Sequence, residues 1–118
     1  MSDYPRALDK MLAAWNEQHP ELIRAHLVDA LATDVRFVDP SIDLVGLDMF
    51  EANIRKTQQE LPGAIYSRTS SIDSQHSFHR YHWAIHLNGK LILPGFDVTR
   101  VDESGQITDV IGFFGEFP

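Results

Sequence analysis

The sequence predicts an α+β layer fold, with about three helices in the first half packed on a mostly antiparallel sheet from the second half. Up to residue 61, large apolar residues recur mainly in steps of three and four, as on one face of a helix. After Gly63 the chain consists of β-rich segments separated by turn residues. Its 118 residues suffice for one hydrophobic core, so we expect residues 1–118 to form a single domain.

Three segments have the helical pattern. Residues 5–18 place their apolar side chains on one stripe, and a proline suits the first turn of this helix. A second helix is expected over residues 20–31, again with proline near its start. The third is expected over residues 48–61, where Asp48 and Glu51 resemble a capping box with aspartate as the cap. These helices pack one face each against the sheet.

The strands are bounded by turn signals. Residues 35–39 predict a short strand that ends at Asp39-Pro40, because the residue before proline favours extended backbone. Later strands are expected over 64–71, 77–87, 90–101 and 106–114. Asn88-Gly89 is typical of a type I′ hairpin turn, and residues 102–105 form a second turn.

Composition excludes several classes of function. The net charge of −7, with no cluster of basic residues, argues against a nucleic-acid or anionic-membrane partner. The absence of cysteine removes disulfides, thiolate nucleophiles and cysteine-bound zinc. No segment is apolar enough to be a signal peptide or to span a bilayer, so we expect a cytoplasmic protein.

The order of elements carries a family resemblance. Two helices are followed by a strand ending in Val38-Asp39-Pro40, a third helix, and long hairpins that contain Phe96-Asp97-Val98 before the Asp102-x-x-Gly105 turn. This order resembles the nuclear transport factor 2-like superfamily, and within it the SnoaL-like polyketide cyclases and ketosteroid isomerase. The resemblance covers nearly the whole chain and implies a cone-shaped fold with a curved sheet. Fold analogy alone says little about the chemistry.

The resemblance also implies roles for single residues. Asp39 falls where ketosteroid isomerase has its general base, and Asp97 falls where the isomerase has a protonated aspartate and the SnoaL-like cyclases have their acid/base group. Trp15 falls where the isomerase has a tyrosine, which is a departure from its pattern. An indole N–H can donate a hydrogen bond but cannot exchange a proton near neutral pH.

Strand alternation supports one of these assignments independently of the family. It places His79, Tyr81 and Trp83 on one face of their strand and Asp97 on the matching face of the next. We therefore expect Asp97 to point into an apolar chamber. Its walls would be formed by side chains from several elements, namely Trp15, Tyr66, His79, Tyr81, Trp83 and Phe114.

A carboxyl group in such a chamber should have a raised pKa and be suited to acid/base chemistry. The candidate catalytic residues are Asp39, Asp97 and His79, with His79 as a proton shuttle. Two structural alternatives stay open: Asp39 caps the turn before Pro40, and Asp97 forms an ion pair with Arg80 or Arg100.

The histidines do not predict a metal site. His76, His79, His82 and His86 look regularly spaced, but on a strand His82 and His86 stand about 13 Å apart and His79 faces the opposite way. We therefore expect no metal and no cofactor.

The outer sheet face predicts a partner. Its residues include Ala84, Phe96, Val98, Ile111 and Phe113, which together are too apolar to face water as a continuous patch. We expect a homodimer formed through this face, as is common in the families that the chain resembles. The alternative is that the C-terminal residues 116–118 cover part of the patch within a monomer.

Three functions compete on this basis. The first is an enzyme that moves a proton next to a carbonyl group of a small apolar molecule, by isomerisation or aldol cyclisation. The second is a dehydratase or an epoxide hydrolase, and both rank lower. The hydrolase needs an arginine beside Asp97, but Arg80 and Arg100 face away from it, and the dehydratase needs paired pocket histidines, of which only His79 is well placed. The third is a non-catalytic module that binds a hydrophobic ligand or serves assembly, which the tryptophan at position 15 favours.

Overall fold

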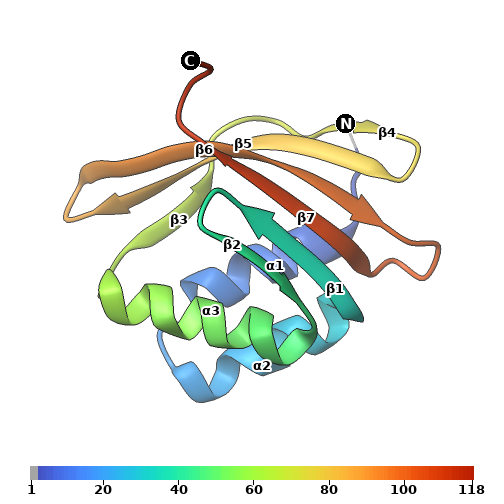
Figure 1. Ribbon diagram of the computed structural model, residues 1–118, viewed down its shortest axis with the longest axis horizontal. Coiled ribbons are helices and arrows are strands. Elements are labelled where there is room, and N and C mark those ends of the chain that lie inside the picture. Colours follow the sequence, from blue (N-terminus) through green and yellow to red (C-terminus); the bar gives the residue numbers. More distant parts are fainter. Residues whose placement is uncertain (1–2) are drawn as a thin grey trace.

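A computed structural model describes residues 3–118 and places three helices against one side of a curved sheet (Figure 1). In chain order the elements are α1 (Arg6–Asn16), α2 (Pro20–Ala30), β1 (Leu31–Asp39), β2 (Ile42–Val45), α3 (Leu47–Glu60), β3 (Ile65–Arg68), β4 (Asp73–Gln75), β5 (Phe78–Leu87), β6 (Lys90–Val101) and β7 (Ile107–Phe114). The predicted α+β class is confirmed.

The sheet is mixed and has the strand order β2-β1-β7-β6-β5-β3, with β4 also paired to β5. Within residues 3–118, β1 and β7 form the one parallel pair, and the remaining pairs are antiparallel. The long strands β5 and β6 form a hairpin through Asn88 and Gly89. Both residues have positive φ values, 53° and 78°, as the predicted type I′ turn requires.

The helical hairpin α1–α2 forms as its apolar spacing predicts. Leu8 and Met11 of α1 and Ile23 and Leu27 of α2 are buried against the rest of the molecule. Pro20 is the first residue of α2, a position at which its missing N–H leaves no hydrogen bond unmade.

Helix α3 begins differently from the prediction. It starts at Leu47 after Gly46, whose φ of 103° suits glycine, and no side chain caps it. The predicted capping box is wrong, because Asp48 and Glu51 instead accept hydrogen bonds from the Arg24 guanidinium of α2, at 2.7 and 2.9 Å. These bonds link α2 to α3.

The sheet contains more strand than the sequence predicts. Strand β1 starts at Leu31, four residues earlier than expected, and the short strands β2 and β4 were not predicted. Four and three residues are too few for apolar alternation to be visible, so main-chain pairing with β1 and β5 defines these strands.

The core consists of two clusters. The larger lies between the helices and the inner sheet face and includes the fully buried Phe50, Ile54 and Ile107. The smaller contains Ala64, Tyr66 and Ile85. Two tryptophans, Trp15 of α1 and Trp83 of β5, pack against both clusters. Within residues 3–118, no helix is long and apolar enough to cross a membrane.

Candidate active site

A cavity of about 260 Å³ lies between the inner face of the sheet and helices α1 and α3. This is slightly below the usual range for ligand pockets, about 300–1,000 Å³, so it suits a small molecule. The lining is mostly apolar and comes from both helices and five strands; among its residues are Leu8, Met11, Leu12, Trp15, Phe37, Leu61, Tyr66, Tyr81, Trp83, Ile85, Leu93, Val110 and Phe114. Asp39 and Asp97 both line this cavity.

Asp97 lies in the middle of β6, opposite Tyr81 of β5. Trp83 donates a hydrogen bond from Nε1 to Asp97 Oδ1 at 2.8 Å, and the Tyr81 hydroxyl donates to Oδ2 at 3.2 Å. Burial raises the pKa of Asp97 to about 7, because these two hydrogen bonds offset only part of the cost of removing the carboxylate from water. The negative charge of Asp39 raises the pKa further.

The position of Trp83 depends on Gly95. The two residues are paired across β5 and β6, and a Cβ atom at Gly95 would lie 2.4 Å from the Trp83 ring and 2.3 Å from the Phe113 carbonyl oxygen. Because glycine leaves this space empty, the indole lies close over the strand. The indole N–H then reaches Asp97, which follows Gly95 by two residues on β6.

Asp39 lies at the end of β1, where it organises the turn into β2. Its Oδ1 accepts three hydrogen bonds, from the Ser41 N–H at 2.8 Å, the Ser41 hydroxyl at 2.9 Å and the Ile42 N–H at 3.1 Å. The structure thus assigns Asp39 the turn role left open above. No hydrogen bond joins Oδ2 to another residue within 3–118, so this oxygen is free for a ligand.

Gly112 of β7 lies beside the side chains of both acids. A Cβ atom there would lie 3.1 Å from Asp97 Oδ1 and 3.5 Å from the Asp39 Cβ. The two acids therefore converge on the same point of the sheet, reached from β1 on one side of β7 and from β6 on the other. Glycine leaves the space between them open to the cavity.

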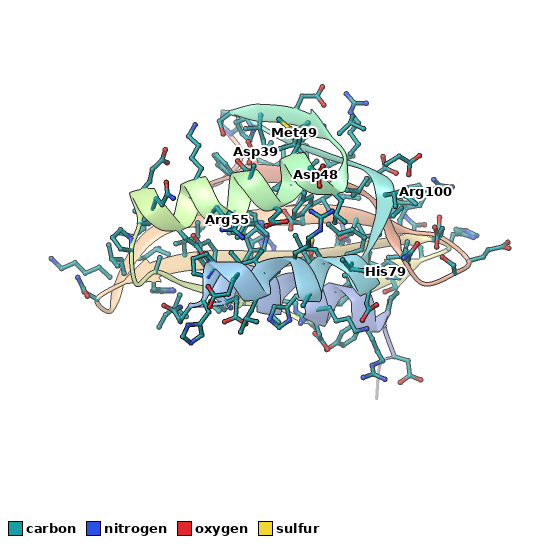
Figure 2. All side chains as sticks on the ribbon, turned by 90° about the horizontal axis from the view of Figure 1, so that it is seen from below. Asp39, Asp48, Met49, Arg55, His79 and Arg100 are labelled. Atoms are coloured by element: carbon teal, nitrogen blue, oxygen red, sulfur yellow. The ribbon has the colours of Figure 1, made fainter. Side chains whose placement is uncertain are left out.

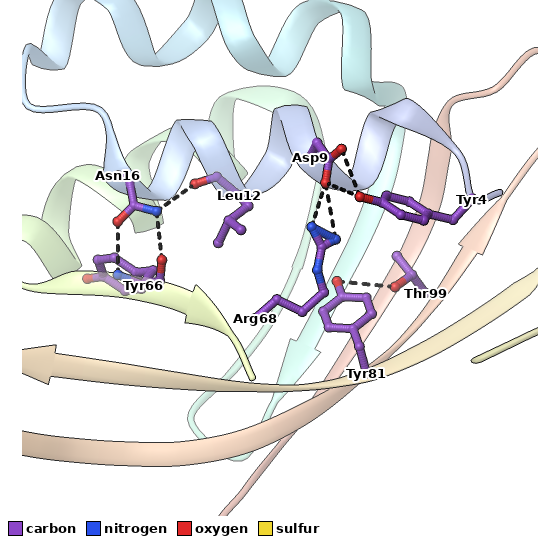
Figure 3. Close-up of polar contacts among 8 residues, drawn as sticks. All are labelled: Tyr4, Asp9, Leu12, Asn16, Tyr66, Arg68, Tyr81 and Thr99. Atoms are coloured by element: carbon purple, nitrogen blue, oxygen red, sulfur yellow. Dashed lines mark hydrogen bonds and ion pairs between the residues drawn. The ribbon is translucent and has the colours of Figure 1, made fainter. Parts of the chain in front are cut away.

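A polar network links Asp97 to the surface through Tyr81 and Arg68. Figure 3 shows the part of it that contains Tyr81, Arg68 and Asp9. The Thr99 hydroxyl donates to the Tyr81 oxygen at 3.4 Å, and the Arg68 guanidinium carbon lies 5.6 Å from the centre of the Tyr81 ring. Arg68 also pairs with Asp9 of α1, whose carboxylate accepts a hydrogen bond from Tyr4. Burial and the charge of Asp97 raise the pKa of Tyr81, so its phenol stays protonated.

The structure brings most of the predicted pocket residues together. Trp15, Tyr66, Tyr81, Trp83 and Phe114 all line the cavity, as do Asp39 and Asp97. The alternation predicted for β5 and β6 is therefore confirmed, because Tyr81, Trp83 and Asp97 lie on the same face of the sheet.

His79 is not brought to this site. It is 7% exposed and its Nδ1 lies 2.7 Å from the Ser74 hydroxyl of β4, but it does not line the cavity. Figure 2 shows the labelled His79 and Asp39 in different parts of the molecule. Burial lowers the pKa of His79. The expected place of His79 in the chamber wall is thus corrected: its partner is a strand that the sequence did not predict.

The arginines considered from the sequence lie outside the site. Arg80 pairs with Asp73 and Arg100 with Asp109, so Asp97 forms no ion pair with either arginine. The arginine that does line the cavity is Arg68. No group of three potential metal ligands occurs within residues 3–118.

Sequence reasoning missed Gly95, Gly112, Ser41 and Arg68. Strand parity could have found the glycines, because it places both on the same face as Asp97. Ser41 follows Asp39-Pro40 and fits an aspartate turn. Arg68 gave no signal, because its role depends on the approach of α1 to β3.

Comparison with known proteins shows which solved structures share this fold. No protein-family model and no curated protein matches the sequence. Among solved structures, a proposed isomerase of the SnoaL-like family from Agrobacterium tumefaciens is 30% identical, with a TM-score of 0.87 over 93% of this chain and 95% of that one.

Two more distant structures show the same fold. A proposed SnoaL-like polyketide cyclase from Jannaschia has a TM-score of 0.72 at 10% identity, over 97% of this chain and 90% of that one. An epoxide hydrolase of Mycobacterium tuberculosis, described as LEH-like, has a TM-score of 0.67 at 16% identity, over 94% and 81%. The identity, coverage and fold shared with the Agrobacterium protein show that this chain belongs to the SnoaL-like family, and its fold is that of nuclear transport factor 2-like proteins.

Proposed function

We propose that the protein is an acid/base enzyme that moves a proton next to the carbonyl group of a small, largely apolar molecule without a cofactor. The observation that carries this proposal is the convergence of Asp39 and Asp97 on Gly112 in a mostly apolar cavity. Proton abstraction beside a carbonyl needs a base at the carbon and a hydrogen-bond donor at the oxygen. Two carboxyl groups in unequal environments can supply both.

In the proposed step, Asp39 Oδ2 takes a proton from the carbon next to the carbonyl. The electron pair of that C–H bond forms a C=C bond, and the carbonyl electrons move onto oxygen. Protonated Asp97 donates a hydrogen bond to this developing enolate oxygen. In an isomerisation the proton on Asp39 then returns to a different carbon. In a cyclisation the enolate carbon attacks a second carbonyl carbon, the π electrons of that carbonyl move onto its oxygen, and the proton on Asp39 goes to this alkoxide oxygen.

The hydrogen bonds of Asp97 support the acid role and its geometry. Trp83 Nε1 can only donate, so Asp97 Oδ1 must accept and a proton on this group belongs on Oδ2. A protonated Oδ2 still accepts the hydrogen bond of the Tyr81 hydroxyl on its remaining lone pair while its own O–H donates to the substrate. Because the pKa of Asp97 is raised to about 7, a large fraction of the protein carries this proton near neutral pH. Oδ2 is therefore the atom we assign to the substrate oxygen.

A non-catalytic binding module is the alternative, and the surroundings of Trp15 favour it. Trp15 packs edge-on against Phe37, at 6.2 Å between ring centres, and against Tyr66 at 5.2 Å. A tryptophan held in this way forms a wall of the cavity and cannot exchange a proton. Such a module would bind an apolar ligand and leave it unchanged.

Deuterium exchange separates the two functions. The probe is 2-tetralone, a two-ring ketone with acidic hydrogens beside its carbonyl, followed by NMR in deuterated buffer. An enzyme should speed deuterium exchange at the carbons beside the carbonyl above the rate in buffer, and Asp39→Asn should remove this acceleration. Saturable binding of 2-tetralone with exchange at the buffer rate would contradict the enzyme and support the module.

We also propose that a second copy of the chain covers the outer sheet face. Phe96 and Phe113 stack there with ring centres 5.0 Å apart, and Phe113 and Ile111 are exposed. The C-terminal Phe117 reaches Phe96 at 6.1 Å, so the tail covers part of the face, but it is itself 84% exposed. Sedimentation should show a dimer at micromolar concentration, and monomer alone would contradict this proposal.

A further inference from the structure

Arg68 is the one positively charged residue among those that line the cavity within residues 3–118. The same lining contains three acidic residues, Asp39, Glu60 and Asp97. The Arg68 side chain is 16% exposed, whereas its partner Asp9 is 54% exposed and does not line the cavity. Burying a cation costs free energy unless anions are bound to it, so a mostly buried guanidinium beside an apolar cavity needs an explanation.

Arg68 lies at an open end of the cavity. A second, more open hollow on the side of Tyr4 adjoins the cavity there, because the two share Leu12, Tyr66, Ser67 and Arg68 in their linings. A ligand group at Arg68 therefore keeps part of its contact with water. A charged group can bind in such a place without the full cost of desolvation.

The pairing with Asp9 uses one edge of the Arg68 guanidinium. Both Nη1 and Nη2 donate to the same oxygen, Asp9 Oδ1, while the Nε–H has no hydrogen-bond partner within residues 3–118. Nε and Nη2 form the second edge on which a guanidinium can hold a carboxylate by two parallel bonds. Arg36 shows this geometry in the same chain, since its Nε and Nη2 bind the two oxygens of Asp43 at 3.0 and 2.8 Å.

Two aromatic rings hold the guanidinium close to Asp97. Its central carbon lies 5.1 Å from the centre of the Tyr4 ring and 5.6 Å from that of the Tyr81 ring (Figure 3). The hydroxyl of the same Tyr81 donates to Asp97 Oδ2. Because Arg68 and Asp97 contact one phenol, a small ligand can reach both of them at once.

We propose that the Nε–Nη2 edge of Arg68 binds a carboxylate group of the ligand, so that the substrate is a small keto acid. This inference rests on the proposed function, which assigns the carbonyl oxygen to Asp97. The negative charge of Asp39 repels the ligand carboxylate and the positive charge of Arg68 attracts it, so the keto acid binds in one orientation. The part of the ligand between its two polar groups stays apolar, like most of the cavity lining.

Deuterium exchange into two matched ketones tests the inference. 4-Oxocyclohexanecarboxylate carries its carboxylate across the ring from the carbonyl, and 4-oxocyclohexanecarboxamide has the same shape without the charge. The wild type should exchange the carboxylate with a kcat/KM about tenfold higher, the gain from hydrogen bonds between charged groups. Arg68→Met should abolish this preference and leave exchange of the carboxamide within about twofold. Arg68→Lys keeps the charge without the planar fork, and should retain part of the preference.

Arg80→Met is the matched control, since it removes a guanidinium that pairs with Asp73 at the surface. It should preserve the preference for the carboxylate. If both ketones exchange above the buffer rate with equal kcat/KM, or if the preference persists in Arg68→Met, the inference is wrong while the proposed function stands.

NMR of the Arg68 Nε–H gives a readout that does not depend on activity. The wild type is labelled with nitrogen-15, Arg68→Met assigns the signal, and the probe is cyclohexanecarboxylate, which has no ketone. The signal should shift to saturation with this carboxylate and stay in place with cyclohexanecarboxamide. A signal that the carboxylate does not move would overturn the inference. If it moves but 2-tetralone and both keto probes exchange at the buffer rate, the carboxylate site stands and the proposed function is wrong.

Discussion

Asp39 and Asp97 line the same cavity, yet the chain holds them in opposite ways. Asp97 sits inside a long strand, and each of its oxygens accepts a hydrogen bond from an aromatic side chain. Asp39 sits at a strand end, where one oxygen accepts three hydrogen bonds from the turn and the other accepts none from residues 3–118. The first carboxyl is enclosed by side chains, and the second is held by backbone and Ser41.

This difference shows how one fold can give two carboxyl groups separate tasks. The surroundings of Asp97 disfavour its charged form and raise its pKa to about 7, which suits a hydrogen-bond donor. The turn fixes one oxygen of Asp39 and leaves the other without a partner among residues 3–118, in a residue that lines the cavity, which suits a base. The position of each residue along its strand therefore favours the role that we propose for it.

The largest effect should come from exchanging the two acids for amides. An amide cannot take up a proton, so Asp39→Asn should lower the rate of 2-tetralone exchange about a thousandfold. Asn at position 97 can still donate a hydrogen bond from the place of Oδ2, so Asp97→Asn should cost only about tenfold. The NMR exchange assay measures both, and a greater loss for Asp97→Asn would reverse the assigned roles.

The next largest effect should be a difference in stability between alanine substitutions at the two glycines beside the acids. Gly95→Ala places a methyl group against the Phe113 backbone and the Trp83 ring, so we expect a loss of about 3 kcal/mol or more in the free energy of unfolding. Gly112→Ala meets mainly the Asp97 carboxylate, which can shift, so its cost should be about 1 kcal/mol. Urea unfolding of both variants checks this order, and equal costs would contradict it.

A smaller effect is expected in the pH dependence of stability. An unfolded Asp97 is ionised above about pH 4, whereas the folded one keeps its proton until about pH 7. The contribution of Asp97 is therefore full below pH 4 and is lost as pH rises toward and through 7, by about 3 kcal/mol between pH 5 and 8. Asp97→Asn lacks this contribution, because its side-chain amide does not titrate in this range.

Urea unfolding of the wild type and Asp97→Asn across this range isolates the contribution. Other groups, such as His79 with its lowered pKa, are present in both proteins and cancel in the difference. The variant should gain stability relative to the wild type as pH rises from 5 to 8. A constant difference across this range would show that Asp97 is not perturbed.

Much of the site was predictable because alternation along strands is reliable. It placed Tyr81, Trp83 and Asp97 on the inner face before any fold was known. The family resemblance added Asp39, which has no local signal beyond the proline that follows it. The predicted hairpin at Asn88-Gly89 formed because few residues other than these adopt two consecutive positive φ values.

What could not be predicted depends on contacts between distant segments. His79 was expected in the cavity wall, but the three-residue strand β4 brings Ser74 to it. The capping box failed because Arg24, on another helix, attracts Asp48 and Glu51. The pairing of Asn16 with Tyr66 joins residues fifty positions apart, and no spacing in the sequence indicates it.

The most direct test of the account is the titration of Asp97 itself. Carbon-13 labelling of aspartate allows the Asp97 carboxyl carbon to be followed by NMR, with Asp97→Asn to assign its signal. The account predicts a midpoint at about pH 7. A midpoint near 4, the ordinary value for aspartate, would show that the carboxyl is ionised at neutral pH and would contradict the acid role assigned to Asp97.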